Sequence, residues 1–161
     1  MSASVLAVCI SLKKGERKTP VPSVELVAEH GIAGDAHAGD WHRQVSLLAQ
    51  ESIDKMRNMG LDVSAGDFAE NITTSGIELV NLPIGTRFTL GPALLEVTQI
   101  GKECHTRCAI FYQAGDCVMP KEGIFARVLQ GGVVAAGDSL NLAPPGVSAT
   151  APGALFHTIV R

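Results

Sequence analysis

Aromatic residues are scarce in this chain, at 4% of its 161 residues, although hydrophobic residues make up 46%. The expected core is therefore built from Val, Leu, Ile and Ala. The hydrophobic fraction predicts a packed globule rather than a disordered segment, and a chain of this length fits one domain.

The chain also lacks a cluster of positive charge. Its formal net charge is -3, and no group of Lys and Arg residues forms a patch that could follow a nucleic acid backbone. We therefore expect no nucleic acid partner.

Long apolar runs are missing as well. No stretch approaches the roughly 20 residues needed to cross a bilayer, so we expect no membrane association. Residues 1–18 run from apolar to basic, which is the reverse of a secretory signal. The expected location is the cytoplasm, where cysteines are more often catalytic, redox-active or metal-binding than joined in structural disulfides.

Three of the four cysteines lie in one short stretch, at Cys104, Cys108 and Cys117. The apolar run Ala93–Ile100 precedes them and predicts a strand, so Cys104 would stand in a loop just past the strand end. A rigid strand that feeds a loop is a common way to hold a reactive side chain in a cleft. Buried or incidental cysteines are the alternative, because free cysteine is among the most buried residue types.

The neighbours of Cys104 bear on its reactivity, because the thiolate is the reactive form and positive charge increases its population. The nearby residues that can carry positive charge are Lys102, His105 and Arg107. Glu103 has the opposite effect, because its negative charge lowers the thiolate population. Cys9 has apolar neighbours in a strand expected over residues 4–12, so we expect it in the core.

A second chemically dense stretch covers residues 30–50. Its glycines suit a loop wrapped around a ligand, and its polar residues include His30, Asp35, His37, Asp40, His42 and Arg43. The spacing of His37 and His42 does not match the i, i+4 pair that one helical face presents to a metal. We favour hydrogen bonds from His37, His42 and Arg43 to an oxyanion of a ligand; a solvated loop without function stays open.

The remaining pattern is one of short strands, glycine turns and one convincing helix. Ser46 is the expected cap of a helix over residues 47–59, and residues 13–18 read as a polar turn. Strands are expected at residues 4–12, 24–27, 86–90 and 93–100 and within 123–130 and 133–142. This pattern predicts a mostly β, single-domain barrel or sandwich with one or a few short helices. Residues 1–142 form the expected domain, and the Pro, Gly and Ala-rich residues 143–161 form a tail.

Six segments in fixed order carry a family resemblance: GIAGDAHAG at 31–39, HRQVSLL at 42–48, GDFAENITTSGI at 66–77, LPIGT at 82–86, EVTQ at 96–99 before Cys104, and GIFARV at 123–128. Together they resemble the MOSC domain, named for the C-terminal domain of molybdenum cofactor sulfurase, from about Val5 to Leu140.

The resemblance implies a fold built around a β-barrel and a single functional cysteine, which Cys104 matches. That cysteine would carry sulfur as a persulfide or coordinate the molybdenum of a bound pterin cofactor. The residues expected to hold this molybdenum cofactor (molybdopterin) are His37, His42, Arg43, Gln44, Asn71, Lys102 and Arg127. Cys108 and Cys117 could resolve a persulfide as a disulfide. Asn71 also fits an ordinary turn residue before a strand.

The chain departs from the family in two ways. Members often show Arg and Pro shortly before the cysteine, whereas Gly101, Lys102 and Glu103 stand here. The chain also lacks the aminotransferase-like domain of full sulfurases, so we expect it to bind no pyridoxal phosphate by itself. The implied partners are a sulfur donor such as a cysteine desulfurase and a molybdoenzyme or a cofactor biosynthesis protein.

Two other functions stay open. A structural zinc module would use Cys104, Cys108 and Cys117 with His105 or His37, although the cysteine spacing fits no common zinc ribbon. A thiol redox switch would pair Cys104 with Cys108, without the usual Cys-x-x-Cys spacing. No general base is evident, so the sequence favours cofactor binding over catalysis, with a sulfurtransferase-like activity and the choice of molybdenum or tungsten left open.

Overall fold

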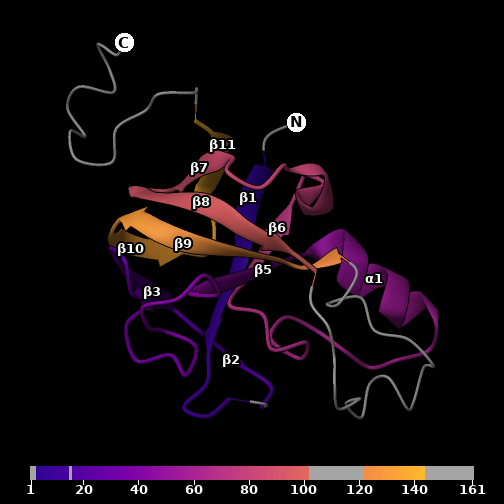
Figure 1. Ribbon diagram of the computed structural model, residues 1–161. Coiled ribbons are helices and arrows are strands. Elements are labelled where there is room, and N and C mark those ends of the chain that lie inside the picture. The colour runs from indigo at the N-terminus through magenta and orange to yellow at the C-terminus, as the bar shows by residue number, and fades with distance from the viewer. Residues whose placement is uncertain (1–2, 15, 102–121, 144–161) are drawn as a thin grey trace.

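A computed structural model describes residues 3–14, 16–101 and 122–143 of the chain (Figure 1). Its elements are β1 (Ala3–Ile10), β2 (Thr19–Val21), β3 (Ser23–Val27), β4 (Gly31–Ile32), β5 (Val45–Ala49), α1 (Gln50–Asn58), β6 (Ile72–Ser75), η1 (Leu79–Asn81, a 3-10 turn), β7 (Arg87–Leu90), β8 (Ala93–Ile100), β9 (Ile124–Gln130), β10 (Gly132–Ala135) and β11 (Ser139–Leu142).

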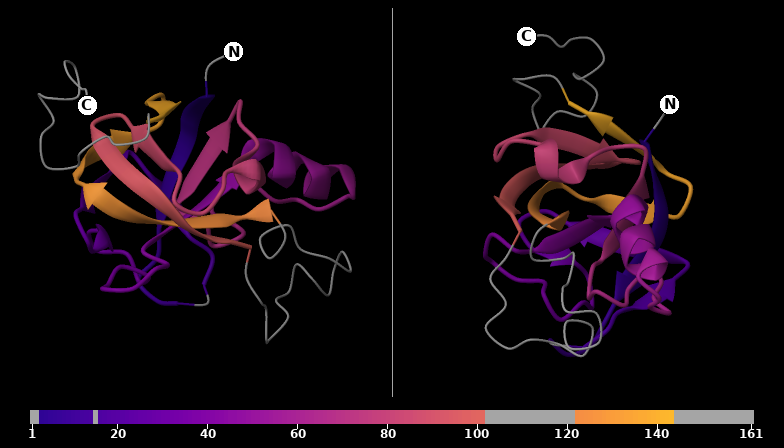
Figure 2. Two further views of the ribbon diagram at one scale, coloured as in Figure 1. Left: turned by 45° about the horizontal axis from the view of Figure 1, so that its top comes forward. Right: turned by 90° about the vertical axis from the view of Figure 1, so that its right-hand side faces the viewer.

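The larger sheet closes into a barrel. Its strands follow the order β11, β7, β8, β9, β5, β6, β1, and β1 pairs back to β11. Strand β2 extends the sheet from β1, and a separate three-stranded sheet has the order β10, β3, β4. Figure 2 shows the barrel from two further sides, with α1 beside β5 and β6. The predicted mostly β fold is confirmed, and of the two architectures it is the barrel.

The alternation of side chains along the strands fills the barrel. On β9, Ile124, Ala126 and Val128 are buried in the main core, while Arg127 between them lies on the outer face, as the two-residue period of a strand requires. Most of this core is Val, Leu, Ile and Ala, and Phe88 is its one aromatic member among the described residues. The expected core composition is therefore confirmed.

The predicted start of the helix was wrong. Ser46 lies inside β5, and α1 begins at Gln50 with Ala49 as a cap that makes no side-chain hydrogen bond. All five residues of β5 are buried, because Leu47 faces the barrel while Leu48 joins a second apolar cluster with α1. A strand buried on both faces has a continuous apolar run, which its periodicity cannot separate from a buried helix.

Two further expectations concern other parts of the chain. Cys9 is fully buried, as predicted. The residue that ends the expected polar turn, Lys18, is also buried, which the sequence did not indicate. Among the described helices, none is long and apolar enough to cross a membrane.

Candidate functional site at the end of strand β8

Strand β8 ends beside the start of β9, at the place where the cysteine-bearing segment begins. The main-chain nitrogen of Gly101 donates a hydrogen bond to the oxygen of Gly123 at 2.7 Å. The predicted site residues Lys102, Cys104, His105, Cys108 and Cys117 lie outside the described residues. Their assigned roles therefore stay predictions, and the site is built here from what surrounds Gly101.

His42 and Arg43 both contact the side chain of Gln99 near that strand end. The Nε2 atom of His42 lies 2.8 Å from Gln99 Oε1, and Arg43 Nε donates to the same oxygen at 3.1 Å. Gln99 Nε2 in turn donates to the main-chain oxygen of Gly101 at 2.7 Å. His42 and Arg43, both predicted from the sequence to bind a ligand, thus contact the same side chain. Through Gln99 they are linked to Gly101, the last described residue before Cys104.

A β-bulge makes this arrangement feasible. The pairing of β8 with β9 shifts register between Val97 and Gln99, which leaves Thr98 as the extra residue. The Thr98 hydroxyl donates to the main-chain oxygen of His42, so two consecutive residues of β8 contact the same loop residue. Successive side chains of a regular strand point to opposite faces, and a bulge changes that direction locally.

Arg43 is the side chain best suited to bind an anion. Its guanidinium carbon lies 5.3 Å from the centre of the Phe125 ring, which supports the flat side chain from below. Within the described part of the chain, only its Nε atom has a hydrogen-bond partner. The two terminal nitrogens therefore remain available for a carboxylate or phosphate, which arginine binds in a bidentate manner.

Arg127, another predicted cofactor contact, is held by carboxylates on the outer face of the barrel. Its Nε donates to Glu96 at 2.9 Å, and Glu29 lies 3.3 Å from its terminal nitrogen. The hydrogen bond to Glu96 raises the pKa of Arg127, and Glu29 adds to this effect. Arg87 also lies 3.5 Å from Glu96. The charge of Arg127 is thus largely balanced within the protein.

His37 lies in the glycine-rich loop, residues 31–39. Its Nδ1 atom is 3.0 Å from Lys18 Nζ, and Lys18 also donates to Asp35 at 2.8 Å. The His37 ring stacks parallel to Trp41 with 6.5 Å between the ring centres, and Trp41 meets the edge of His42 at 5.8 Å. The structure therefore connects His37 to His42 through Trp41.

Gln44 and Asn71 have their amides engaged in the fold. Gln44 is 1% exposed, and its Oε1 accepts from Val128 N at 2.9 Å. Asn71 is fully buried; its Oδ1 accepts from Ser46 N at 3.0 Å, and its Nδ2 donates to Cys9 O at 3.1 Å. A heterocycle could reach the Asn71 amide only if these bonds were broken.

One protein family matches most of the chain. The family model for the MOSC domain matches residues 34–141. The chain belongs to the MOSC domain family. The matched range contains His42, Arg43 and Gln99, together with all three cysteines of the central stretch.

Solved structures share the fold of this MOSC domain. The YuaD protein from Bacillus subtilis is 19% identical with a TM-score of 0.74, over 88% of this chain and 96% of that one. YiiM from Geobacillus stearothermophilus is 22% identical with a TM-score of 0.66, over 96% and 84%. YiiM from Escherichia coli is 23% identical with a TM-score of 0.65, over 100% and 80%. No curated protein matches the chain.

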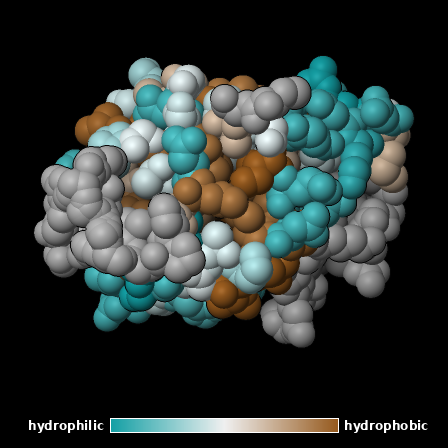
Figure 3. All heavy atoms as spheres, turned by 90° about the horizontal axis from the view of Figure 1, so that it is seen from above, coloured by the Kyte–Doolittle hydropathy of each residue, from teal (hydrophilic) through white to brown (hydrophobic). Residues whose placement is uncertain are grey.

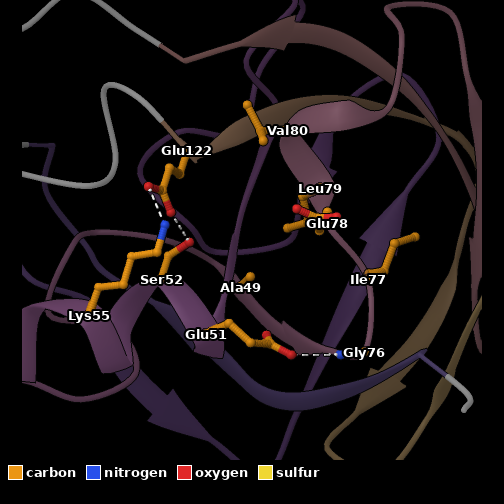
Figure 4. Close-up of a pocket in the computed structure, with 10 residues that line it drawn as sticks. All are labelled: Ala49, Glu51, Ser52, Lys55, Gly76, Ile77, Glu78, Leu79, Val80 and Glu122. Atoms are coloured by element: carbon orange, nitrogen blue, oxygen red, sulfur yellow. Dashed lines mark hydrogen bonds and ion pairs between the residues drawn. The ribbon is translucent and has the colours of Figure 1, made fainter. Parts of the chain in front are cut away.

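A pocket of about 570 Å³ lies between α1 and the segment around η1 (Figure 4). Its described lining includes Glu51, Glu78 and Glu122 and one ammonium group, that of Lys55, which lies 2.9 Å from Glu122. This excess of carboxylates does not suit an anionic ligand. The group formed by His42 and Arg43 is therefore the better candidate for a phosphate-bearing cofactor.

Other surface features of the described residues add no competing site. Figure 3 shows apolar side chains gathered at the centre of the face seen from above, with hydrophilic side chains to their right. Exposed apolar side chains are normal on protein surfaces. Among the residues that the structure describes, no group of three or more His, Cys, Asp or Glu side chains could hold a metal ion.

Sequence reasoning missed Gln99 and Thr98 as parts of the site. Both lie in the EVTQ segment that carries the family resemblance, directly before the cysteine-bearing segment. Their position at a strand end, two and three residues before Gly101, was the signal that could have identified them. The bulge that turns both side chains toward His42 has no comparable sequence signal.

Proposed function

We propose that this MOSC domain binds a molybdenum cofactor of the molybdopterin type, and that Cys104 carries sulfur as a persulfide or coordinates the metal. Membership of the family supports this proposal, since MOSC domains are associated in general with molybdenum cofactor binding and sulfur transfer. The residues around Gly101 supply the second line of support.

The observation that carries the proposal is the convergence of His42 and Arg43 on Gln99 at the end of β8. Arg43 offers two nitrogens without a described partner, which fits the phosphate of a pterin cofactor. Cys104 follows Gly101 by three residues, so covalent geometry keeps it within roughly 11 Å of Gly101. A cofactor whose phosphate binds Arg43 would thus have its metal end within reach of the Cys104 sulfur.

The chemistry assigned to Cys104 needs a sulfur donor, for which we propose a persulfide-bearing partner such as a cysteine desulfurase. The thiolate of Cys104 would attack the outer sulfur of a persulfide on the donor. A sulfur–sulfur bond forms at Cys104, the sulfur–sulfur bond of the donor breaks, and the donor leaves as a thiolate. A bound cofactor would supply the metal, for which cysteine sulfur is a suitable soft ligand.

The test measures molybdenum, tungsten, zinc and pterin in anaerobically purified wild type, Cys104→Ser and Arg43→Met proteins. Arg57→Met, on α1, is the matched control for the loss of an arginine. Metal with pterin in the wild type and the control, and less of both in the two folded site variants, would support the proposal. Zinc in one-to-one ratio without pterin, lost together with the fold in Cys104→Ser, would overturn it in favour of the structural zinc module.

A different variant distinguishes the thiol switch from cofactor binding. Cys108→Ser should leave cofactor content unchanged if Cys104 acts alone in binding. A switch would need both cysteines, so a loss of function in Cys108→Ser equal to that in Cys104→Ser, with no pterin in any of the proteins, would favour it.

A further inference from the structure

We propose that Gln99 is a positioning residue, which fixes the tautomer of His42 and the direction of the Arg43 guanidinium. The inference rests on the proposed function only in that it concerns the same site. Gln99 Oε1 already accepts from both His42 and Arg43, so the effect of this oxygen on a ligand passes through its two partners.

The orientation of the Gln99 amide is determined by its surroundings. Its Nε2 lies 2.7 Å from the main-chain oxygen of Gly101, which can only accept a hydrogen bond. Its Oε1 lies 3.1 Å from Arg43 Nε, which can only donate. Exchanging the amide nitrogen and oxygen would place two acceptors together at Gly101 and two donors together at Arg43. Both contacts therefore exclude the flipped amide.

The amide orientation then determines the state of His42. Gln99 Oε1 is only an acceptor, so the His42 Nε2 atom at 2.8 Å must carry a hydrogen. When the ring is neutral, its Nδ1 is consequently an acceptor, and no described atom bonds it. Because His42 is exposed, this nitrogen is open to a ligand.

The consequence is a defined pattern of hydrogen-bonding groups beside Gly101. Arg43 presents donors on its terminal nitrogens, and the neutral His42 ring presents an acceptor. This pattern fits a ligand that has an oxyanion next to an N–H or O–H group, and it is less suited to an isolated dianion. Without Gln99, the ring could adopt either tautomer and Arg43 would lose its only described hydrogen bond.

The backbone of His42 is held separately, which allows the role of Gln99 to be isolated. The Thr98 hydroxyl donates to the main-chain oxygen of His42 and does not involve the ring. Removing the Gln99 amide should therefore free the His42 ring and the Arg43 side chain while the loop remains attached to β8.

The experiment is nitrogen-15 NMR of the imidazole rings at about pH 8, above the ordinary titration range of histidine. The His42 signals are assigned by their loss in His42→Gln. The wild type is expected to show the Nε2–H tautomer, Gln99→Met a mixture of tautomers, and Gln99→Glu the wild-type tautomer, since a carboxylate still accepts from Nε2–H. Gln130→Met, at the other end of the β8 and β9 pair, should leave the His42 spectrum unchanged.

A second measurement connects the tautomer to ligand binding. Gln99→Met is expected to bind a purified molybdopterin cofactor about tenfold more weakly than the wild type, which corresponds to the loss of about one ordered hydrogen bond. Folding of each variant is checked by its backbone amide spectrum. If Gln99→Met unfolds, Gln99→Leu and Gln99→Glu still compare an amide-free and an acceptor side chain.

The outcomes separate this inference from the proposed function. A single unchanged His42 tautomer in folded Gln99→Met would overturn the positioning role, whatever the protein binds. A changed tautomer in that variant, with no cofactor bound by the wild type, would support the positioning role and count against the proposed function. A changed tautomer with unchanged cofactor affinity would overturn the claim that Gln99 positions His42 and Arg43 for cofactor binding.

Discussion

Lys18 Nζ lies 2.8 Å from Asp35 Oδ1, and both side chains are fully buried. Lys18 precedes β2, whereas Asp35 lies in the glycine-rich loop that leads to His42 and Arg43. Asp35 also accepts from the main-chain nitrogens of Ser11 and His37. The pair therefore connects the loop to the barrel beneath it, and two charges removed from water depend on each other for stabilisation.

Lys18→Met should be strongly destabilising, because it leaves the buried Asp35 carboxylate without its counter-charge. We expect the free energy of unfolding to fall by about 3–5 kcal/mol, measured by urea denaturation. Arg17→Met is the control: Arg17 lies 3.7 Å from Asp67 but is 56% exposed, so its loss should cost less than about 1 kcal/mol. Adding Asp35→Asn to Lys18→Met should recover part of the stability. Equal losses in the two single variants would contradict the buried pair.

The contribution of Asp35 should depend on pH in a definite direction. Burial alone would raise the pKa of Asp35, but the hydrogen bond from Lys18 and those from His37 and Ser11 bring it below its ordinary value of 3.8. A folded pKa below the unfolded one gives stability that is present above about pH 4 and is lost as the pH falls through the folded pKa. The difference in unfolding free energy between wild type and Asp35→Asn should therefore be constant from pH 7 to about pH 5 and shrink below about pH 4. A difference that stays constant to pH 3 would argue against the shift.

The sequence predicted most of the described strands in which a glycine or a polar turn bounds an apolar run, whereas β2, β4 and β6 were not predicted. The expected strand before Gly101 has the bounds of β8. Strand β5 was missed because Leu47 and Leu48 are buried on opposite faces, which removes the alternation that marks a strand.

The site was predictable in its residue types but not in its contacts. His42 and Arg43 were nominated because their chemistry suits an oxyanion, and the structure places them together. The contact of Gln99 with His42 depends on a bulge in β8 and joins two residues that are 57 positions apart in the sequence. Lys18 looks like any solvated turn lysine until the fold brings Asp35 to it. Such long-range pairings leave no local pattern in one sequence.

Asn71→Ala should lower stability, because both ends of the Asn71 amide bond buried main-chain groups. The change leaves Ser46 N and Cys9 O without their side-chain partner, and each unsatisfied buried group costs about 1–3 kcal/mol. Urea denaturation should show a loss of at least about 2 kcal/mol, compared with almost none for the exposed Asn141→Ala. Unchanged stability together with weaker cofactor binding would instead support the predicted ligand contact of Asn71.

Cys9 should be inert in the folded protein. Burial raises the pKa of its thiol to about 12, with a further increase from the nearby Glu70 carboxylate. At pH 8 the thiolate fraction would then be on the order of 10⁻⁴ even if a reagent could reach it. Peptide mapping after iodoacetamide treatment should find Cys9 unmodified in native buffer and modified in urea. Rapid alkylation of Cys9 without denaturant would contradict its place in the core.

Gly66→Ala should be among the most destabilising single-methyl additions, because two separate constraints act on this glycine. Its φ of +90° disfavours any side chain, and a Cβ there would lie 2.1 Å from the main-chain oxygen of Lys18 and 3.2 Å from the Cys9 sulfur. Gly34 shares the first constraint without the second, since its φ is +83° and nothing lies within 4 Å of a Cβ. Gly34→Ala should therefore cost about 1–2 kcal/mol, from the backbone conformation alone.

The difference between these two variants measures the close contact itself. Gly66 also accepts from Lys18 N at 2.8 Å and donates to Glu70 at 2.8 Å, so the backbone cannot move away without breaking those bonds. We expect Gly66→Ala to cost more than about 4 kcal/mol, which urea denaturation or failure to accumulate as folded protein would reveal. Similar losses for Gly66→Ala and Gly34→Ala would mean that Lys18 can shift, and that the buried Lys18 and Asp35 pair tolerates displacement.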